Sequence, residues 1–253
     1  MVGIYFSGTG NTKYVINKFM EYYDGTNNCF SITDSDVIKK IDENKEILLA
    51  YPIQFSNIPK IVKDFINQNS NHFKNKSVFI IATMGLFSGD GAGLSARILK
   101  KHGAKILGGL HLKMPDTVAD SKALKKTLVE NKKIVKNAEV KIKEAVNKLK
   151  NGNPPKDGLN IFNQVSGLLG QRLWFYNKTQ HYTDAIKIDK SKCMGCGLCA
   201  KECPMHNITI KHEKACSSDK CTWCYRCISH CPKQAITLIG KQVIEQVRIE
   251  KYL

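Results

Sequence analysis

Long hydrophobic runs are missing from this sequence. No stretch of its 253 residues approaches the ~18 consecutive apolar residues of a membrane-spanning helix, so we expect no membrane span. The chain also begins without a basic segment and without a small-residue cleavage site, which predicts no secretory signal and a cytoplasmic location. Apolar residues make up 42% and charged residues 24%, an ordinary globular mixture that excludes wholly disordered, collagen-like and coiled-coil chains.

Acidic residues are also few. The 22 Asp and Glu face 39 Lys and Arg, so the formal net charge is +17. A basic excess can indicate nucleic-acid binding, but no helix-turn-helix, zinc-finger or aromatic–basic groove pattern accompanies it, and we expect no nucleic-acid partner. A basic surface instead favours acidic protein partners or an anionic small molecule, because charge steers their approach.

Cysteine is almost absent from the first 192 residues, where only Cys29 occurs. The other nine lie between Cys193 and Cys231. A disulfide scaffold would spread its cysteines along a small secreted domain, so this crowding indicates metal ligation. Eight of the nine form two copies of the pattern C-x2-C-x2-C-x3-C-P, offset by 28 residues, which predicts a duplicated unit.

The two cysteine runs begin at Cys193 and Cys221. Four soft thiolates suit a [4Fe–4S] cube, and three closely spaced cysteines in one loop can hold three of its irons. Zinc is the alternative, but zinc sites typically use two separated CxxC pairs without a third cysteine at the same spacing. Cys216 lies between the runs and is either an alternative ligand or a small packed residue.

Over about Asp184 to Gly240, these motifs resemble the two-cluster bacterial ferredoxins. The resemblance implies a small α+β domain over residues 184–253 with two [4Fe–4S] clusters. In that family the fourth cysteine of each run ligates the other cluster. One cluster would then be held by Cys193, Cys196, Cys199 and Cys231, and the other by Cys221, Cys224, Cys227 and Cys203.

The two copies differ between their ligands. The first copy has Gly195 and Gly197, where the second has Trp223 and Tyr225. These bulky side chains either alter solvent access and potential of the second cluster or merely cover its surface.

The first ~110 residues alternate short apolar runs with helical patterns, which is typical of a parallel sheet covered by helices. Strands are predicted at 2–6, 30–33, 46–50, 77–82 and 105–112, and helices at 11–22, 58–66 and 93–101. An amphipathic helix is predicted over 121–150, with its apolar side on the sheet. These predictions describe a doubly wound α/β domain with a five-stranded parallel sheet over residues 1–150.

The segment 151–183 is predicted to be a helical bridge. Asn151 to Pro155 ends the long helix, and Leu159 to Tyr176 has a second, more apolar helical pattern. Because a flexible linker would be rich in Gly and Ser, we expect this helix to dock the two domains together, with a loosely tethered pair as the alternative.

A run of small polar residues follows the first predicted strand and precedes the first helix. Hydroxyls and backbone N–H groups at a helix N-terminus suit a phosphate monoester, and the run lacks the Lys of a P-loop. It resembles the FMN phosphate loop of the flavodoxins, whose sheet binds FMN at its topological switch point. The loop residues are Ser7, Gly8, Thr9, Gly10, Asn11 and Thr12.

The flavodoxin resemblance also implies that the loops after the third and fourth strands enclose the flavin. The candidate stacking rings are Tyr51, Phe55 and Phe87. The full set of candidate residues in these loops is Tyr51, Pro52, Ile53, Gln54, Phe55, Thr83, Met84, Gly85, Phe87, Gly89, Asp90 and Gly91.

As a whole, the chain resembles iron–sulfur flavoproteins of anaerobes, which join a flavodoxin-like domain to a two-cluster ferredoxin domain. The resemblance implies FMN, two [4Fe–4S] clusters and redox protein partners. Clusters move single electrons and FMN takes one or two, so we predict an electron-transfer protein. The alternative is an FMN-dependent reductase of a small organic substrate, fed by its own clusters. The sequence identifies no catalytic acid or base.

Overall fold

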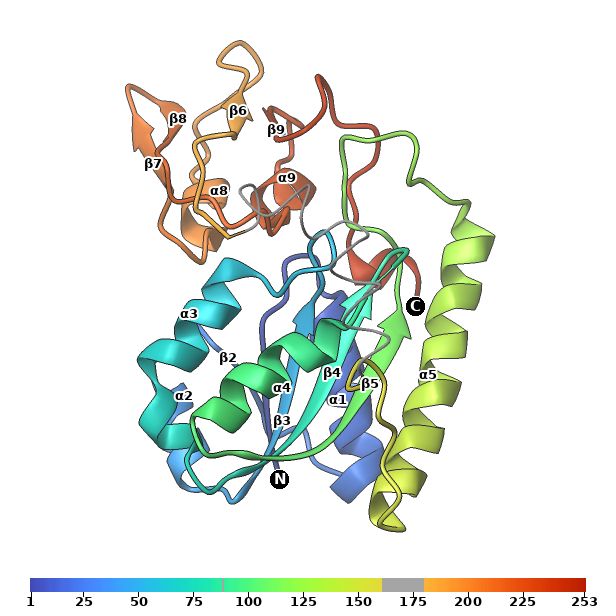
Figure 1. Cartoon of the computed structure of the whole chain (residues 1–253). Helices are drawn as coiled ribbons and strands as arrows, with labels where there is room; N and C mark the ends of the chain where they lie inside the picture. Colours follow the sequence, from blue (N-terminus) through green and yellow to red (C-terminus); the bar gives the residue numbers. More distant parts are fainter. Residues whose placement is uncertain (88, 161–179) are drawn as a thin grey trace.

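The N-terminal half of the chain is a doubly wound α/β domain (Figure 1). The structure, a computed structural model, describes residues 1–87, 89–160 and 180–253. Five parallel strands form one sheet in the order β2-β1-β3-β4-β5, which confirms the predicted fold class. The strands are β1 (Val2–Tyr5), β2 (Cys29–Ser31), β3 (Glu46–Pro52), β4 (Ser77–Met84) and β5 (Lys105–Lys113).

Helices cover both faces of the sheet. Because both faces are buried, β3 and β4 are nearly continuous apolar runs rather than alternating ones. One face packs against α2 (Val37–Asp42), α3 (Lys60–Gln68) and α4 (Gly91–Lys101). The other packs against α1 (Asn11–Asp24) and α5 (Leu128–Lys150). Helix α2 was not predicted, because six residues are too few to show a helical period.

Helix α5 begins later than predicted. Its first residue is Leu128 rather than a position near 121, because Thr127 and Glu130 form a capping box. The Glu130 N–H donates to Thr127 Oγ1 at 3.2 Å, and such a cap is worth about 1 kcal/mol. Val135 and Ile142 lie on the sheet as expected. The apolar residues before the cap do not, and Leu124 faces a cavity instead.

The chain after α5 runs along the outer edge of β5. Gly109 N–H donates to the Pro155 carbonyl and Asp157 N–H to the Gly109 carbonyl, both at 2.9 Å. These bonds pair an edge strand that would otherwise present free backbone groups. The helix predicted over 159–176 lies almost entirely outside the described residues.

The C-terminal half carries a small α+β domain built from two similar units (Figure 1). The short helices α8 (Leu198–Glu202) and α9 (Arg226–His230) begin 28 residues apart, as the cysteine repeat predicts. Two antiparallel pairs accompany them: β6 (Lys187–Ile188) with β9 (Ile236–Thr237), and β7 (Ile208–Lys211) with β8 (Lys214–Ser217).

The last residues of the chain return to the α/β domain. Val247, Ile249 and Tyr252 are buried against α1 and α5. Ile249 is the first residue of the short 3-10 helix η3 (Ile249–Lys251). Figure 1 shows the C-terminus beside β5 and α5. Among the described helices, none has the length and apolar character needed to cross a membrane.

Candidate functional site

A cavity of about 280 Å³ opens at the carboxyl ends of β1, β3, β4 and β5. The strand order reverses between β1 and β3, and open α/β sheets bind ligands at such a switch point. Thirteen of the predicted FMN-loop residues line it: Ser7, Gly8, Thr9, Asn11, Thr12, Pro52, Ile53, Gln54, Phe55, Thr83, Met84, Gly85 and Phe87.

The loop before α1 presents unpaired polar atoms to this cavity. Ser7 Oγ, Thr9 Oγ1 and Asn11 Oδ1 are buried and have no hydrogen-bond partner among the described residues. The Asn11 amide donates to the Pro115 carbonyl at 2.7 Å, which fixes that side chain. Buried polar groups without partners are costly, so they indicate a missing ligand. A helix N-terminus with free hydroxyls fits the phosphate of FMN.

Not every predicted residue reaches the cavity. Tyr51 is fully buried in the core, and its hydroxyl donates to the Gly91 carbonyl or to Ser95 Oγ, both at 2.7 Å. Asp90 is also buried and forms an ion pair with Arg97 at 2.6 Å. The predicted residues that do not line the cavity are Gly10, Tyr51, Gly89, Asp90 and Gly91. Of the three candidate rings, Phe55 and Phe87 line it and Tyr51 does not.

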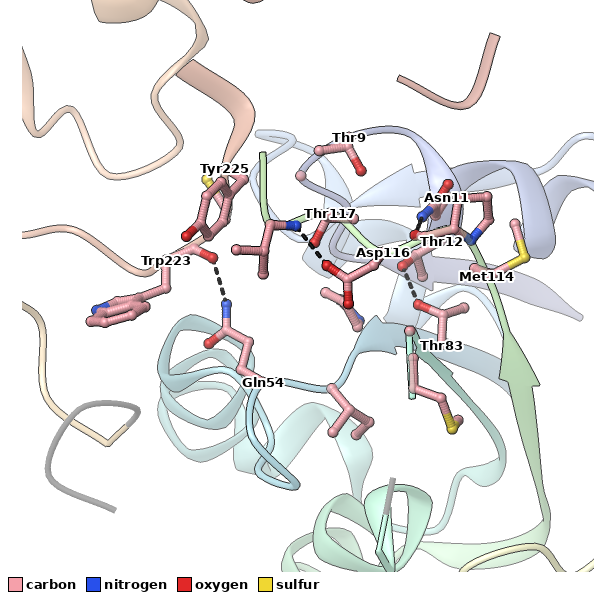
Figure 2. Close-up of a pocket in the computed structure, with 18 of the residues that line it drawn as sticks. Thr9, Asn11, Thr12, Gln54, Thr83, Met114, Asp116, Thr117, Trp223 and Tyr225 are labelled. Carbon is pink, nitrogen blue, oxygen red and sulfur yellow. Dashed lines mark hydrogen bonds between the residues drawn. The ribbon is translucent and has the colours of Figure 1, made fainter. Parts of the chain in front are cut away.

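The loop after β5 also lines the cavity, which the sequence did not predict. Asp116 lies near the middle of the view in Figure 2 and accepts a hydrogen bond from the Val118 N–H at 2.8 Å. It is the one carboxyl group among the described lining residues, and burial raises its pKa. Asp116 belongs to no motif, so the sequence gave no signal for it.

The small α+β domain over residues 184–253 supplies another wall of the cavity. Trp223, Cys224, Tyr225 and Ile239 line it, and Figure 2 shows Trp223 and Tyr225 on the side opposite Asn11 and Thr12. The one signal in the sequence was the replacement of the first copy's two glycines by Trp and Tyr.

Direct hydrogen bonds hold the second cysteine loop on the α/β domain. Gln54 Nε2 donates to the Thr222 and Trp223 carbonyls at 2.9 and 3.1 Å (Figure 2). Arg226 donates to the Ser7 carbonyl at 2.7 Å. Gly8 packs so closely on the Cys224 carbonyl that any side chain at position 8 would collide with it.

Asp120 forms a second connection between the halves. Its carboxylate accepts the N–H groups of Leu238, Ile239 and Gly240 at 2.7–2.9 Å and the Tyr225 hydroxyl at 3.0 Å. Burial alone would raise the pKa of this carboxyl, but the four donors outweigh burial and hold the pKa below its usual value. The C-terminal tail adds a bond from the Ile249 N–H to the Thr9 carbonyl at 3.1 Å.

Eight cysteines surround two further cavities. One is lined by Cys193, Cys196, Cys199 and Cys231, and the other by Cys203, Cys221, Cys224 and Cys227. Each set combines three cysteines of one run with the fourth of the other run. Backbone N–H groups approach four of the sulfurs at 3.3–3.4 Å, an arrangement that suits cluster-ligating thiolates. Cys29 and Cys216 line neither cavity.

The two thiol cavities differ in exposure. Burial raises the pKa of the Cys221 thiol to about 12, and Cys227 is buried as well. In the first loop, Cys196 is exposed and the Met194 side chain is 58% exposed. Hydrogen bonds from backbone amides, that of Ala215 foremost, lower the pKa of Cys193. The second loop is therefore internal and the first faces outward.

Comparisons with known proteins agree with both halves. A flavodoxin domain model matches residues 3–108, and a 4Fe-4S binding domain model matches residues 186–209. No curated protein matches the sequence significantly.

Three solved flavodoxin structures each align with somewhat more than half of this chain. A flavodoxin from the domain Archaea covers 59% of this chain and 97% of its own, at 15% identity and a TM-score of 0.43. The two-electron reduced flavodoxin of Megasphaera elsdenii covers 56% and 99%, at 20% identity and a TM-score of 0.39. The Fusobacterium nucleatum flavodoxin bound to flavin mononucleotide covers 59% and 96%, at 14% identity and a TM-score of 0.40.

The family models, the parallel sheet and the cysteine runs lead to one conclusion. The chain is a flavodoxin–ferredoxin fusion, an electron-transfer protein whose flavodoxin domain implies FMN and whose 4Fe-4S domain implies an iron–sulfur cluster.

Proposed function

We propose that the chain passes electrons between a redox partner, two [4Fe–4S] clusters and FMN, and that the inner cluster exchanges them directly with FMN. Residues 1–150 would form the FMN-binding domain, 151–183 the bridge and 184–253 the two-cluster domain. The inner cluster would use Cys203, Cys221, Cys224 and Cys227, and the outer cluster Cys193, Cys196, Cys199 and Cys231.

One observation carries the proposed route. Cys224 and Tyr225 line both the FMN cavity and the inner thiol cavity, so a two-residue wall divides the two sites. FMN held along the phosphate loop would supply a centre that accepts one or two electrons. The residues of the wall would keep cluster and flavin at a fixed separation, because Gln54 and Arg226 bond the inner cysteine loop to the flavodoxin domain.

The outer cluster loop is the proposed entry for a partner. Met194 and Cys196 are exposed there, and Lys192 and Lys233 are exposed beside the loop and its cavity. Exposed lysines around the apolar Met194 side chain favour the docking of an acidic one-electron carrier protein, since complementary charge raises the rate of encounter.

Anaerobic iron, sulfide and flavin analysis of the reconstituted chain tests the cofactor content. The proposal requires eight irons, eight sulfides and one FMN per chain, by the stoichiometry of two cubes. Rapid reduction of the clusters, followed at the FMN absorbance, then tests the route. Intramolecular transfer gives a rate independent of protein concentration. A rate proportional to concentration, or no flavin reduction without an added carrier, would rule out the direct route.

The reductase alternative remains a prediction. Product analysis with candidate organic acceptors separates it from pure electron transfer, because a reductase consumes the acceptor in step with flavin oxidation.

A further inference from the structure

The two cysteine loops adopt the same unusual backbone conformation with different residues. In the outer loop, Gly195 and Gly197 have φ angles of +70° and +74°. At the equivalent positions of the inner loop, Trp223 and Tyr225 have φ angles of +58° and +60°. Glycine adopts this left-handed region freely, whereas a side chain with a Cβ is strained in it.

The strain has no cause in the loop itself. The outer loop shows that glycine serves the same turn around the same spacing of cysteines. Strained residues persist where the surrounding structure holds them, and they gather at functional sites. The reason for the aromatic residues must therefore lie in what their side chains contact.

Both aromatic side chains are fixed against the FMN cavity. Trp223 meets Phe55, itself a lining residue, edge to face with 6.0 Å between ring centres. Tyr225 is 4% exposed, and its hydroxyl is held by Asp120. Both residues line the cavity on the side opposite Asn11 and Thr12 (Figure 2).

We propose that Trp223 and Tyr225 are FMN-contacting residues, so that the iron–sulfur domain supplies an aromatic wall of the flavin site. This inference rests on the proposed function, in which FMN fills the cavity. Of the candidate rings in the flavodoxin loops, Tyr51 is committed to the core, which leaves Phe55 and Phe87 with the two aromatic residues of the inner cluster loop. Such aromatic side chains favour the binding of a flat ring system such as that of the flavin, because aromatic faces and edges attract one another.

Substitution of Trp223 by Gly tests the proposal, because the outer loop already tolerates Gly at that position. We expect the dissociation constant of the deflavinated, cluster-loaded chain for FMN, titrated by flavin fluorescence, to rise at least about tenfold, or 1.4 kcal/mol. Trp223→Phe keeps a ring and should stay within about threefold of wild type. Lys220→Gly removes an exposed side chain just before the inner loop that lines none of the three cavities, and it should leave FMN affinity unchanged.

Iron and sulfide content is measured in the same samples. If Trp223→Gly binds FMN with wild-type affinity while both clusters are present, this inference is wrong and the proposed function is unaffected. Absence of FMN binding by the wild-type chain overturns both. If Trp223→Gly loses iron, Trp223→Leu keeps bulk without an aromatic face, and the same tenfold criterion decides the question.

Discussion

The Asp120 carboxylate offers the sharpest test of how the two domains are held together. Asp120→Asn keeps the shape of the side chain but removes its charge. Three backbone N–H groups and the Tyr225 hydroxyl then face a neutral amide in a site where the native side chain is 5% exposed. Solvent replaces this loss poorly at the two buried donors, the Leu238 N–H and the Tyr225 hydroxyl.

The magnitude follows from the four hydrogen bonds. A bond to a charged group contributes about 1.5–3 kcal/mol, against about 1 kcal/mol for a neutral one. Because three of the donors share one carboxylate oxygen, the losses do not add fully. We expect Asp120→Asn to lower the free energy of unfolding by about 2–4 kcal/mol at neutral pH. The lowered pKa of Asp120 means that its stabilisation is present above the unfolded-state pKa and is lost as the pH falls through the folded one.

Anaerobic urea denaturation of the cluster- and FMN-loaded chain measures this effect. Asp219→Asn is the control, since Asp219 is an exposed carboxylate of the 184–253 domain to which Asp120 bonds, and it should change stability by less than about 0.5 kcal/mol. Asp120→Asn should also slow flavin reduction by the clusters, because Tyr225 loses its anchor. If the two variants denature at the same urea concentration, Asp120 does not hold the domains together.

Four further predictions follow from the same contacts. Cys203→Ala should abolish the cluster of the Cys221 run and spare the other, as seen by low-temperature EPR; loss of the other cluster alone would contradict the crossed sets. Thr9→Glu should expel FMN by repulsion of its phosphate, and wild type should prefer FMN to riboflavin; equal affinity for both flavins would disprove a phosphate site. Because burial raises the pKa of Asp116, its ionisation destabilises the fold, so the stability of Asp116→Asn relative to wild type should grow as the pH rises from about 4, the ordinary pKa of Asp, through the raised pKa, and then level off; a gain that shrinks as the pH rises would contradict this. Lys233→Glu should slow reduction by an acidic carrier, most strongly at low salt; a rate unchanged at low salt would place the docking surface elsewhere.

Local sequence was enough to predict the sheet, most of its helices and an iron–sulfur domain. Strand-length apolar runs and helical periods predicted the five-stranded parallel sheet, since each depends on neighbours within a few residues. The cysteine spacing predicted an iron–sulfur domain for a similar reason, because three ligands of a cube must come from one tight loop. The phosphate loop remains a prediction, which the sequence allowed because its six residues are consecutive.

The errors came from competition between local signals. Apolar residues from Leu124 onward continued the helical period, yet the capping box at Thr127 sets the start of α5. Tyr51 was adjacent to residues that line the cavity, but alternation along a strand points neighbours to opposite sides, and its side chain entered the core.

The sequence by itself determined which cofactors the two domains imply, because the flavodoxin and cysteine motifs each lie in short consecutive segments. Only the tertiary structure decided how the two domains contact each other. Asp116, Asp120, Trp223 and Tyr225 converge from segments up to about a hundred residues apart, and no pattern within either segment specifies that contact. The physical reason is that the shared wall is made by long-range hydrogen bonds and packing, which depend on how the folded domains fit against each other.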